Sequence, residues 1–195
     1  MPHHIYETKA LILGSTPSRE ADRQLLLFSR EFGLIYATAQ GVRELKSKLR
    51  YSLQPYSLSS INLVHGRSGW RITNARLETN FFFDTRESNA RLTVLARVSA
   101  LLWRLLTGQE RNEVFFDSLI PGIRFLAQLP ETSLPEAELL LVLCILHHLG
   151  YLGESGTLSS ILVSGFWNLE AVFKVSRMRT MLVHTVNESL RASHL

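Results

Sequence analysis

Cysteine is almost absent from this sequence. Cys144 is the single cysteine among 195 residues, which excludes an intramolecular disulfide and a cysteine-rich zinc module. Because it lies in the apolar run LLLVLCIL, we expect a buried thiol that packs as a small hydrophobic group.

Long hydrophobic runs are missing as well. The apolar stretch from Leu139 to Leu149 is 11 residues long before Gly150, which is too short to span a bilayer. The N-terminal residues MPHHIYETKA contain no positively charged region followed by an apolar stretch, so no secretion signal is predicted. We therefore expect a cytoplasmic protein without a membrane partner.

The local motifs of catalytic and metal sites are also lacking. The turn-rich segment Gly14–Asp22 has neither a GKS or GKT ending nor a second glycine, and no H-E-x-x-H, C-x-x-C or nucleophile elbow occurs. The pair His147–His148 lies on a predicted helix, and we expect its two side chains to diverge rather than to hold a metal. A nuclease would need clustered carboxylates for its metal, whereas the acids of residues 1–80 are dispersed. We expect no enzyme, no cofactor and no metal.

Positive charge is concentrated in the first part of the chain. Hydrophobic residues make up 46% and charged residues 19%, which is typical of a folded protein. The net charge of +4 is uneven: residues 1–80 hold 11 Lys or Arg against 6 Asp or Glu, and residues 81–195 hold 10 against 11. A site for a polyanion should therefore lie in the N-terminal part.

The first 80 residues alternate between apolar and polar positions, as β-strands do. Loop-forming residues Gly14–Pro17 end the first run, and Gly66–Gly69 forms a hairpin turn. The long connection Val42–Pro55 contains a possible helical turn at 44–49. The runs that we expect to form strands are 10–13, 24–28, 34–40, 58–65 and 70–75. Five strands in this length predict a closed Greek-key barrel such as the OB-fold, and an SH3-like barrel fits equally well.

From about residue 85 the apolar period becomes helical. One helix follows Leu92–Leu106 and ends before Gly108; a second, capped by Asn112, should bend or break at Pro121-Gly122. Residues 133–136 have the spacing of a capping box before a helix that runs to Leu149, and 178–189 form one narrow apolar stripe. Residues 158–175 show no clean period. We expect an α+β protein with an OB-fold barrel at 1–80 and a helical domain at 81–195.

The segment Ala39–Tyr56, AQGVRELKSKLRYSLQPY, is the strongest candidate for a binding site. On a connection that we expect to be exposed, it holds four basic residues and one acidic residue, Glu44. The basic residues are Arg43, Lys46, Lys48 and Arg50. Clustered surface cations repel one another and contribute nothing to a core, so they favour a polyanionic ligand such as nucleic acid. A merely solvated loop is the alternative.

Aromatic residues near this segment are candidates for stacking against unpaired bases. For each of them we expect partial burial in the barrel wall rather than stacking, and Tyr51, which lies inside the basic run, is the best placed for contact. The others are Tyr36, Tyr56 and Trp70. Arg67 and Arg71, with Arg76, are further candidates for DNA contact, although arginines at strand edges also serve solubility alone.

These residues also carry a resemblance to a known family. The order and spacing of E-A-D-R at 20–23, F-S-R-E-F-G at 28–33, A-Q-G-V-R at 39–43, and K-S-K-L-R followed by L-Q-P-Y resemble the bacterial DNA repair protein RecO family over about 75 residues. The second half fits more loosely, through H-H-L-G-Y and the tail N-E-S-L-R-A-S-H-L.

The resemblance implies an OB-fold followed by a helical domain, binding of single- and double-stranded DNA, and annealing of complementary strands. It also implies work at the nucleoid with RecR and the single-stranded-DNA-binding protein, which together help RecA to load. The DNA-contacting basic residues of the family would correspond to Arg43, Lys46, Lys48 and Arg50.

The chain departs from the family pattern in two places. Many relatives carry a four-cysteine zinc knuckle after L-G-Y, whereas Gly150-Tyr151-Leu152 is followed here by GESGTLSSILVSGF without cysteine. The helix 135–149 carries no Lys or Arg for the acidic tail of the single-stranded-DNA-binding protein; Arg97, Arg104, Arg177 and Arg179 are possible anchors. An interaction adaptor with weak DNA contact is therefore the alternative to a DNA-binding and annealing factor.

Overall fold

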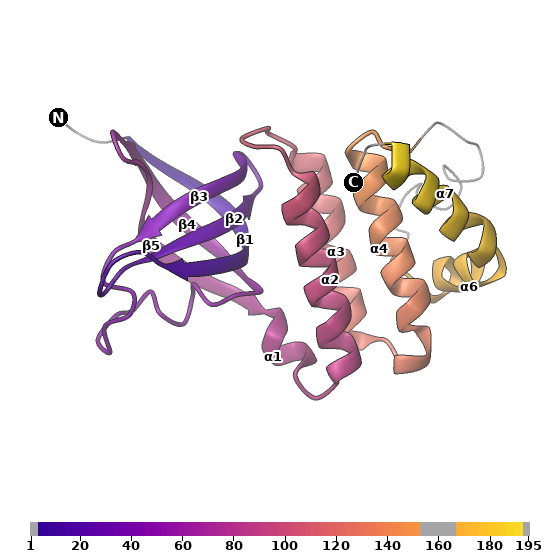
Figure 1. The fold of residues 1–195 in the computed structure, drawn as a ribbon. Helices are drawn as coiled ribbons and strands as arrows, with labels where there is room; N and C mark the ends of the chain where they lie inside the picture. Colours follow the sequence, from indigo (N-terminus) through magenta and orange to yellow (C-terminus); the bar gives the residue numbers. More distant parts are fainter. Residues whose placement is uncertain (1–3, 153–166, 193–195) are drawn as a thin grey trace. The chain divides into compact units, whose positions relative to one another are not determined.

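The computed structural model describes residues 4–152 and 167–192 (Figure 1). By their internal contacts the residues form two compact units. One consists of Met1–Asp84 with Trp103–Phe116, and the other of Thr85–Leu102 with Asp117–Leu195. The first unit also includes residues 103–116, which lie beyond the predicted boundary at residue 80. The division into domains 1–80 and 81–195 therefore stays a prediction.

Within the described residues, five strands close into a barrel, with the order β1-β2-β3-β5-β4. β1 is antiparallel to both β2 and β4, which closes the barrel, and β3 runs parallel to β5. This Greek-key order confirms the predicted OB-fold over the SH3-like alternative. The strands are β1 (Ile5–Pro17), β2 (Arg23–Ser29), β3 (Gly33–Ala39), β4 (Ser57–Gly66) and β5 (Gly69–Asn80).

The first strand is longer than the sequence predicted. Residues Gly14–Pro17, expected to form a loop, continue β1 and pair with β2 as far as Pro17↔Arg23. The register shifts between Ile12 and Gly14, where a bulge lets the strand bend. Its first half can therefore pair with β4, through Ile5–Leu11, while its second half pairs with β2.

Side chains alternate between the interior and the outer surface of the barrel, as pleated strands require. On β3, Ile35, Ala37 and Ala39 belong to the buried core, whereas Tyr36 is exposed. The core is completed from the long connection between β3 and β4, whose Val42 and Leu53 are buried in the same cluster. This anchors both ends of the connection.

The connection between β3 and β4 is a chain of turns rather than a helix. Its backbone hydrogen bonds include Glu44 N to Gly41 O, Ser47 N to Glu44 O and Arg50 N to Ser47 O, so the expected helical turn at 44–49 does not form. A short helix there would lack an apolar face, because Leu45 is 90% exposed. In Figure 1 the segment is the long purple loop at the lower end of the barrel.

Residues 103–116 complete the barrel unit. Leu34 N donates to Gly108 O over 3.0 Å, and the ring of Phe28 lies 5.2 Å from Phe115 and 5.3 Å from Phe116. All three phenylalanines are buried. The helix ends around Gly108 therefore supply part of the barrel's packing.

The regular elements after the barrel strands are all helical in the described residues, as predicted. Asn112 Oδ1 accepts from Phe115 N at 3.0 Å, which confirms the predicted cap, and Gly150 takes a positive φ of 76° after α4. The elements are α1 (Phe81–Thr85), α2 (Asn89–Leu105), α3 (Glu113–Gln128), η1 (Glu131–Ser133), α4 (Leu134–His148), α6 (Leu169–Arg177) and α7 (Arg179–Ala192).

The structure differs from two local expectations about these helices. α3 does not break at Pro121, because buried Leu119 and Ile123 on either side hold it in place; the alternative, a bend there, stays a prediction. Ser133 stands at the N-cap of α4, but its side chain makes no capping hydrogen bond. With ψ at 0° it also ends η1, and its backbone is not in the extended region that a capping side chain needs. Of the ambiguous stretch 158–175, residues 158–166 lie outside the described part.

Candidate nucleic-acid interface

The basic connection, which we define as Arg43, Lys46, Lys48 and Arg50, is exposed on the barrel surface. Its backbone is tied to the β1–β2 loop, because Arg43 N donates to Ala21 O at 3.0 Å and Gly41 N donates to Asp22 Oδ1 at 2.9 Å. Within the described residues, no carboxylate forms an ion pair with any of the four cations. Their charges therefore remain available to a ligand.

Arg43 and Arg50 converge on one depression, the connection hollow, of about 480 Å³. Lys46 and Lys48 are not among its lining residues and lie elsewhere on the loop. Its lining combines three arginines with apolar and amide side chains: Arg23, Val42, Arg43, Arg50, Leu53, Gln54 and Pro55.

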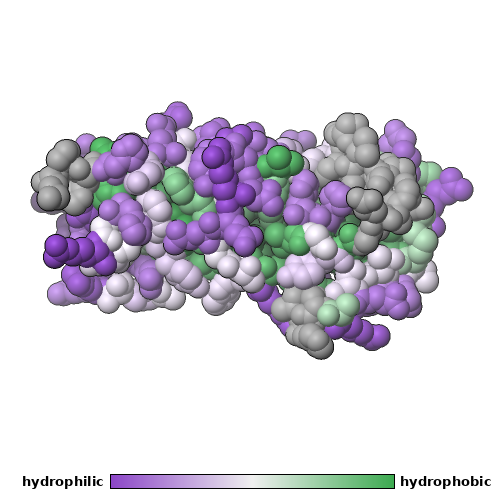
Figure 2. Space-filling model, turned by 90° about the horizontal axis from the view of Figure 1, so that it is seen from above, coloured by the Kyte–Doolittle hydropathy of each residue, from purple (hydrophilic) through white to green (hydrophobic). Residues whose placement is uncertain are grey.

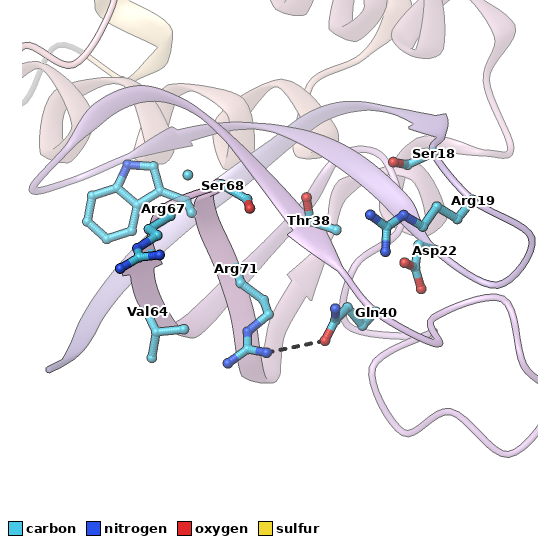
Figure 3. A pocket seen from close by; sticks show the side chains of 12 residues that line it. Ser18, Arg19, Asp22, Thr38, Gln40, Val64, Arg67, Ser68 and Arg71 are labelled. Atoms are coloured by element: carbon cyan, nitrogen blue, oxygen red, sulfur yellow. Dashed lines mark hydrogen bonds between the residues drawn. The ribbon is translucent and has the colours of Figure 1, made fainter. Parts of the chain in front are cut away.

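A second depression, the hairpin hollow of about 360 Å³, brings the other two predicted arginines together (Figure 3). Arg67 and Arg71 enter it from the β4–β5 hairpin, and Arg19 enters from the β1–β2 loop. Arg71 Nη1 donates to Gln40 Oε1 at 3.4 Å. The polar lining is completed by Ser18, Asp22, Thr38 and Ser68.

The chemistry of the hairpin hollow suits a phosphate group. Its lining contains three guanidinium groups and one carboxylate, that of Asp22, which already accepts the Gly41 amide. Guanidinium groups bind phosphate oxygens through charge-assisted and often bidentate hydrogen bonds, and hydroxyl groups can add further donors. Such contacts position a sugar–phosphate chain without reading its bases.

Sequence reasoning missed Arg19 and Arg23. Both flank the segment Glu20-Ala21-Asp22, and Arg23 Nη1 is oriented by a 2.7 Å hydrogen bond to Ser15 Oγ. The sequence does contain features that could have identified them: Arg23 ends the E-A-D-R motif, and both arginines belong to the surplus of basic residues in 1–80. What the sequence did not reveal is that the β1–β2 loop lies beside the basic connection.

Arg76 is a weaker candidate, because a carboxylate lies close to it. Burial raises the pKa of Glu78, but hydrogen bonds from Ser60 and Lys9 and the charges of Lys9 and Arg76 outweigh this and hold the pKa below its ordinary value. Part of the Arg76 charge is therefore offset within the barrel.

The four candidate aromatic residues differ in their environments. Tyr51 is 72% and Tyr36 is 51% exposed, so both rings are accessible, whereas Tyr56 is half-buried at a backbone φ of 64°. Trp70 is buried in the barrel core, with its ring 5.3 Å from Tyr6 and 5.1 Å from Phe32. The expected burial of Trp70 in the barrel is therefore confirmed, and its ring is not an open stacking platform.

The remaining sequence expectations concern metals and membranes. The His147 and His148 rings lie 5.4 Å apart rather than diverging, yet within the described residues no three His, Cys, Asp or Glu side chains gather as a metal site would require. The stretch where relatives carry the zinc knuckle, 153–166, is outside the described part. Of the helices that the structure describes, none has both the length and the apolar character of a bilayer span. On the face shown in Figure 2 the barrel surface is mainly hydrophilic.

Comparison with known proteins points to one family. Residues 1–81 match the family described as "Recombination protein O N terminal". Relatives named "DNA repair protein RecO" include those of Pelotomaculum thermopropionicum (33% identical over 63% of this chain and 48% of the relative), Desulfitobacterium hafniense (31%, 75% and 52%) and Acaryochloris marina (35%, 73% and 46%). The chain thus spans about half the length of the curated relatives it matches. The N-terminal barrel of this chain thus matches the N-terminal domain of the recombination protein O (RecO) family.

Proposed function

We propose that this chain is a DNA repair and recombination factor that binds single- and double-stranded DNA and anneals complementary strands. One observation carries the proposal: cations from three segments gather on the barrel unit, with no ion pair to a carboxylate in the described part. They are Arg19 and Arg23, then Arg43, Lys46, Lys48 and Arg50, then Arg67 and Arg71. The names of the relatives support the same role.

The geometry suggests how annealing would work. Cations that contact phosphates neutralise the backbone charge, so a second strand can approach with less repulsion. Because the hollows offer guanidinium and hydroxyl donors rather than a groove-reading helix, binding would be independent of sequence. Any complementary pair of strands could then meet on the same surface.

The proposal is tested by strand annealing with a four-alanine variant, R43A/K46A/K48A/R50A. We expect its DNA affinity to fall by more than tenfold and its annealing to be lost, because four phosphate contacts disappear together. A matched control replaces four exposed cations of the helical unit, R124A/K174A/R177A/R191A, and changes the net charge equally. Unchanged annealing in the first variant would contradict the proposal.

A second candidate function, an interaction adaptor, is favoured by a groove of about 540 Å³ on the helical unit. Its apolar lining includes Val94, Leu139 and Val142, from α2 and α4. At its rim Arg97 pairs with Glu138 at 3.3 Å, and Arg179 lies 3.9 Å from Glu136. An acidic peptide with an apolar end, such as the tail of the single-stranded-DNA-binding protein, would compete for these arginines.

On this adaptor reading, the chain would bring RecR and the single-stranded-DNA-binding protein together at the nucleoid so that RecA can load. The variant R97A/R179A separates the two functions. It should lose binding to the single-stranded-DNA-binding protein and keep annealing of bare DNA. If the four-alanine variant anneals normally while R97A/R179A loses recruitment, the adaptor function is preferred.

A further inference from the structure

A third depression on the barrel unit, the aromatic hollow of about 440 Å³, has a different chemical character. Tyr36, His65 and Trp103 are among its lining residues, together with Leu34 and Leu106. Trp103 is 59% exposed and Tyr36 is 51% exposed. Large aromatic side chains contribute most when they are buried, so two accessible rings in one hollow indicate a surface that is covered by a ligand.

The two rings come from distant parts of the sequence and are held by backbone contacts. Tyr36 points outward from the middle of β3, and the parallel pair Ala37↔Trp70 sets the β4–β5 hairpin beside it. Trp103 belongs to the 103–116 segment, which Leu34 N fixes through its 3.0 Å bond to Gly108 O. The aromatic hollow is therefore built by the fold and lies partly outside the residues matched by the family.

The aromatic hollow adjoins the hairpin hollow. Gly69 and Trp70 line both of them. Along β3 the outward residue Tyr36 lines the aromatic hollow, and the next outward residue, Thr38, lines the hairpin hollow. Neighbouring outward positions on a strand are roughly 7 Å apart, so a ligand at Arg67 and Arg71 would extend into the space between Tyr36 and Trp103.

We propose that the aromatic hollow holds one unstacked base of a single strand whose phosphates lie against Arg67 and Arg71. This inference rests on the proposed DNA binding and adds a property to it, namely a preference for unpaired strands. Every base offers a π-face to an aromatic ring, so the site would not depend on sequence. A base within a duplex is stacked and paired and cannot enter without being flipped out.

The test compares Y36A/W103A with Y36F/W103F on three probes: an oligothymidylate, an abasic strand of equal length, and a duplex. Stacking of one base is worth roughly tenfold in affinity, so the unmodified protein should prefer the oligothymidylate to the abasic strand by about that factor. The alanine variant should lose this preference and the phenylalanine variant should keep it. Affinity for duplex should fall by much less than affinity for the oligothymidylate.

Fluorescence provides a second measurement. The oligothymidylate should quench the exposed Trp103, so W103F should remove most of the quenching, and the abasic strand should quench far less. The variant F173A, which removes an exposed ring from the helical unit, is the matched control, and circular dichroism checks that each variant is folded.

The possible failures are distinguishable. If the protein binds neither strands nor duplex, the proposed function fails and this inference fails with it. If it binds all three probes but Y36A/W103A discriminates between oligothymidylate and abasic strand as the unmodified protein does, only the aromatic site is refuted.

Discussion

Gly33 links the barrel strands to the segment 103–116. It begins β3 at a φ of 62°, a left-handed conformation that disfavours any side chain. A Cβ at this position would also lie 2.8 Å from Glu110 N and collide with the carbonyl oxygen of the same residue. The atoms that the Cβ would approach belong to the backbone of Glu110, which cannot rotate away as a flexible side chain could.

We predict that Gly33→Ala destabilises the protein by roughly 2 kcal/mol or more, from the conformational cost and the collision together. Chemical denaturation measures the change. Gly66→Ala is the matched control, because a Cβ at Gly66 would meet no atom within 4 Å and its φ is not in the left-handed range. Equal stability of the two variants would show that the segment 103–116 is not packed against Gly33.

Cys144 illustrates what a local sequence pattern can predict. The run LLLVLCIL indicated a buried thiol, and the residue is fully buried in α4. Burial raises the pKa of the thiol to about 12, so almost no thiolate forms at neutral pH. We predict that a thiol reagent labels the protein only at the rate of unfolding. Rapid labelling of the native protein would contradict this placement.

Among the larger elements, the β3–β4 connection depends on one side chain outside it. Asp22 Oδ1 accepts the Gly41 amide and fixes the start of the connection. We predict that Asp22→Ala loosens the connection and speeds tryptic cleavage at Arg43, Lys46, Lys48 and Arg50. Asp22→Asn retains the acceptor oxygen and should be cleaved at nearly the rate of the unmodified protein. Equal cleavage rates for all three proteins would exclude this anchor.

Glu78 of β5 gives the barrel a pH dependence. Its carboxylate lies 3.3 Å from Lys9 Nζ of β1 and accepts from Ser60 Oγ of β4 at 2.7 Å. Because its pKa is lowered from 4.5 in the folded state, its stabilising contribution is present above pH 4.5 and is lost as the pH falls through the folded pKa. Stability measured from pH 6 downward should fall less steeply in Glu78→Gln. Parallel curves would contradict the linkage.

The elements also mark where local sequence reasoning stops. Alternation predicted β3 and the inner part of β4 because each buries one face. It wrongly predicted a loop at Gly14–Pro17. Despite their loop-like composition, these residues pair with β2 beyond a bulge. It likewise predicted a bend or a break at Pro121, where burial of both flanking turns of α3 keeps the helix from breaking. In both cases a contact distant in sequence overrides the local preference.

At the scale of the whole molecule, the candidate site also combines residues that the sequence reveals with residues that only the fold brings together. The basic connection and the pair Arg67 and Arg71 could be found by reading charges along the chain. Arg19 and Arg23 could not be assigned to the site, because only the barrel topology brings the β1–β2 loop to it. Trp103 could not be assigned to the site from the sequence either, because it lies beyond the barrel residues 1–80.

The salt dependence of DNA binding measures how many of these cations contact phosphates. On a single strand each neutralised phosphate contributes about −0.7 to the slope of log K against log salt. If the basic connection acts alone, the slope is about −3 and disappears in R43A/K46A/K48A/R50A. Because Arg19, Arg67 and Arg71 share the hairpin hollow, we instead expect a slope of about −5 that falls to about −2 in this variant.

The variant R19A/R67A/R71A supplies the complementary measurement, with an expected slope of about −3. The helical residues carry no surplus of positive charge, so the control R124A/K174A/R177A/R191A should leave the slope near −5. If that control lowers the slope as much as the barrel variants do, the phosphates are bound by the net charge of the molecule and not by the barrel surface. A slope that falls only in the two barrel variants assigns DNA binding to the basic connection and the hairpin hollow together.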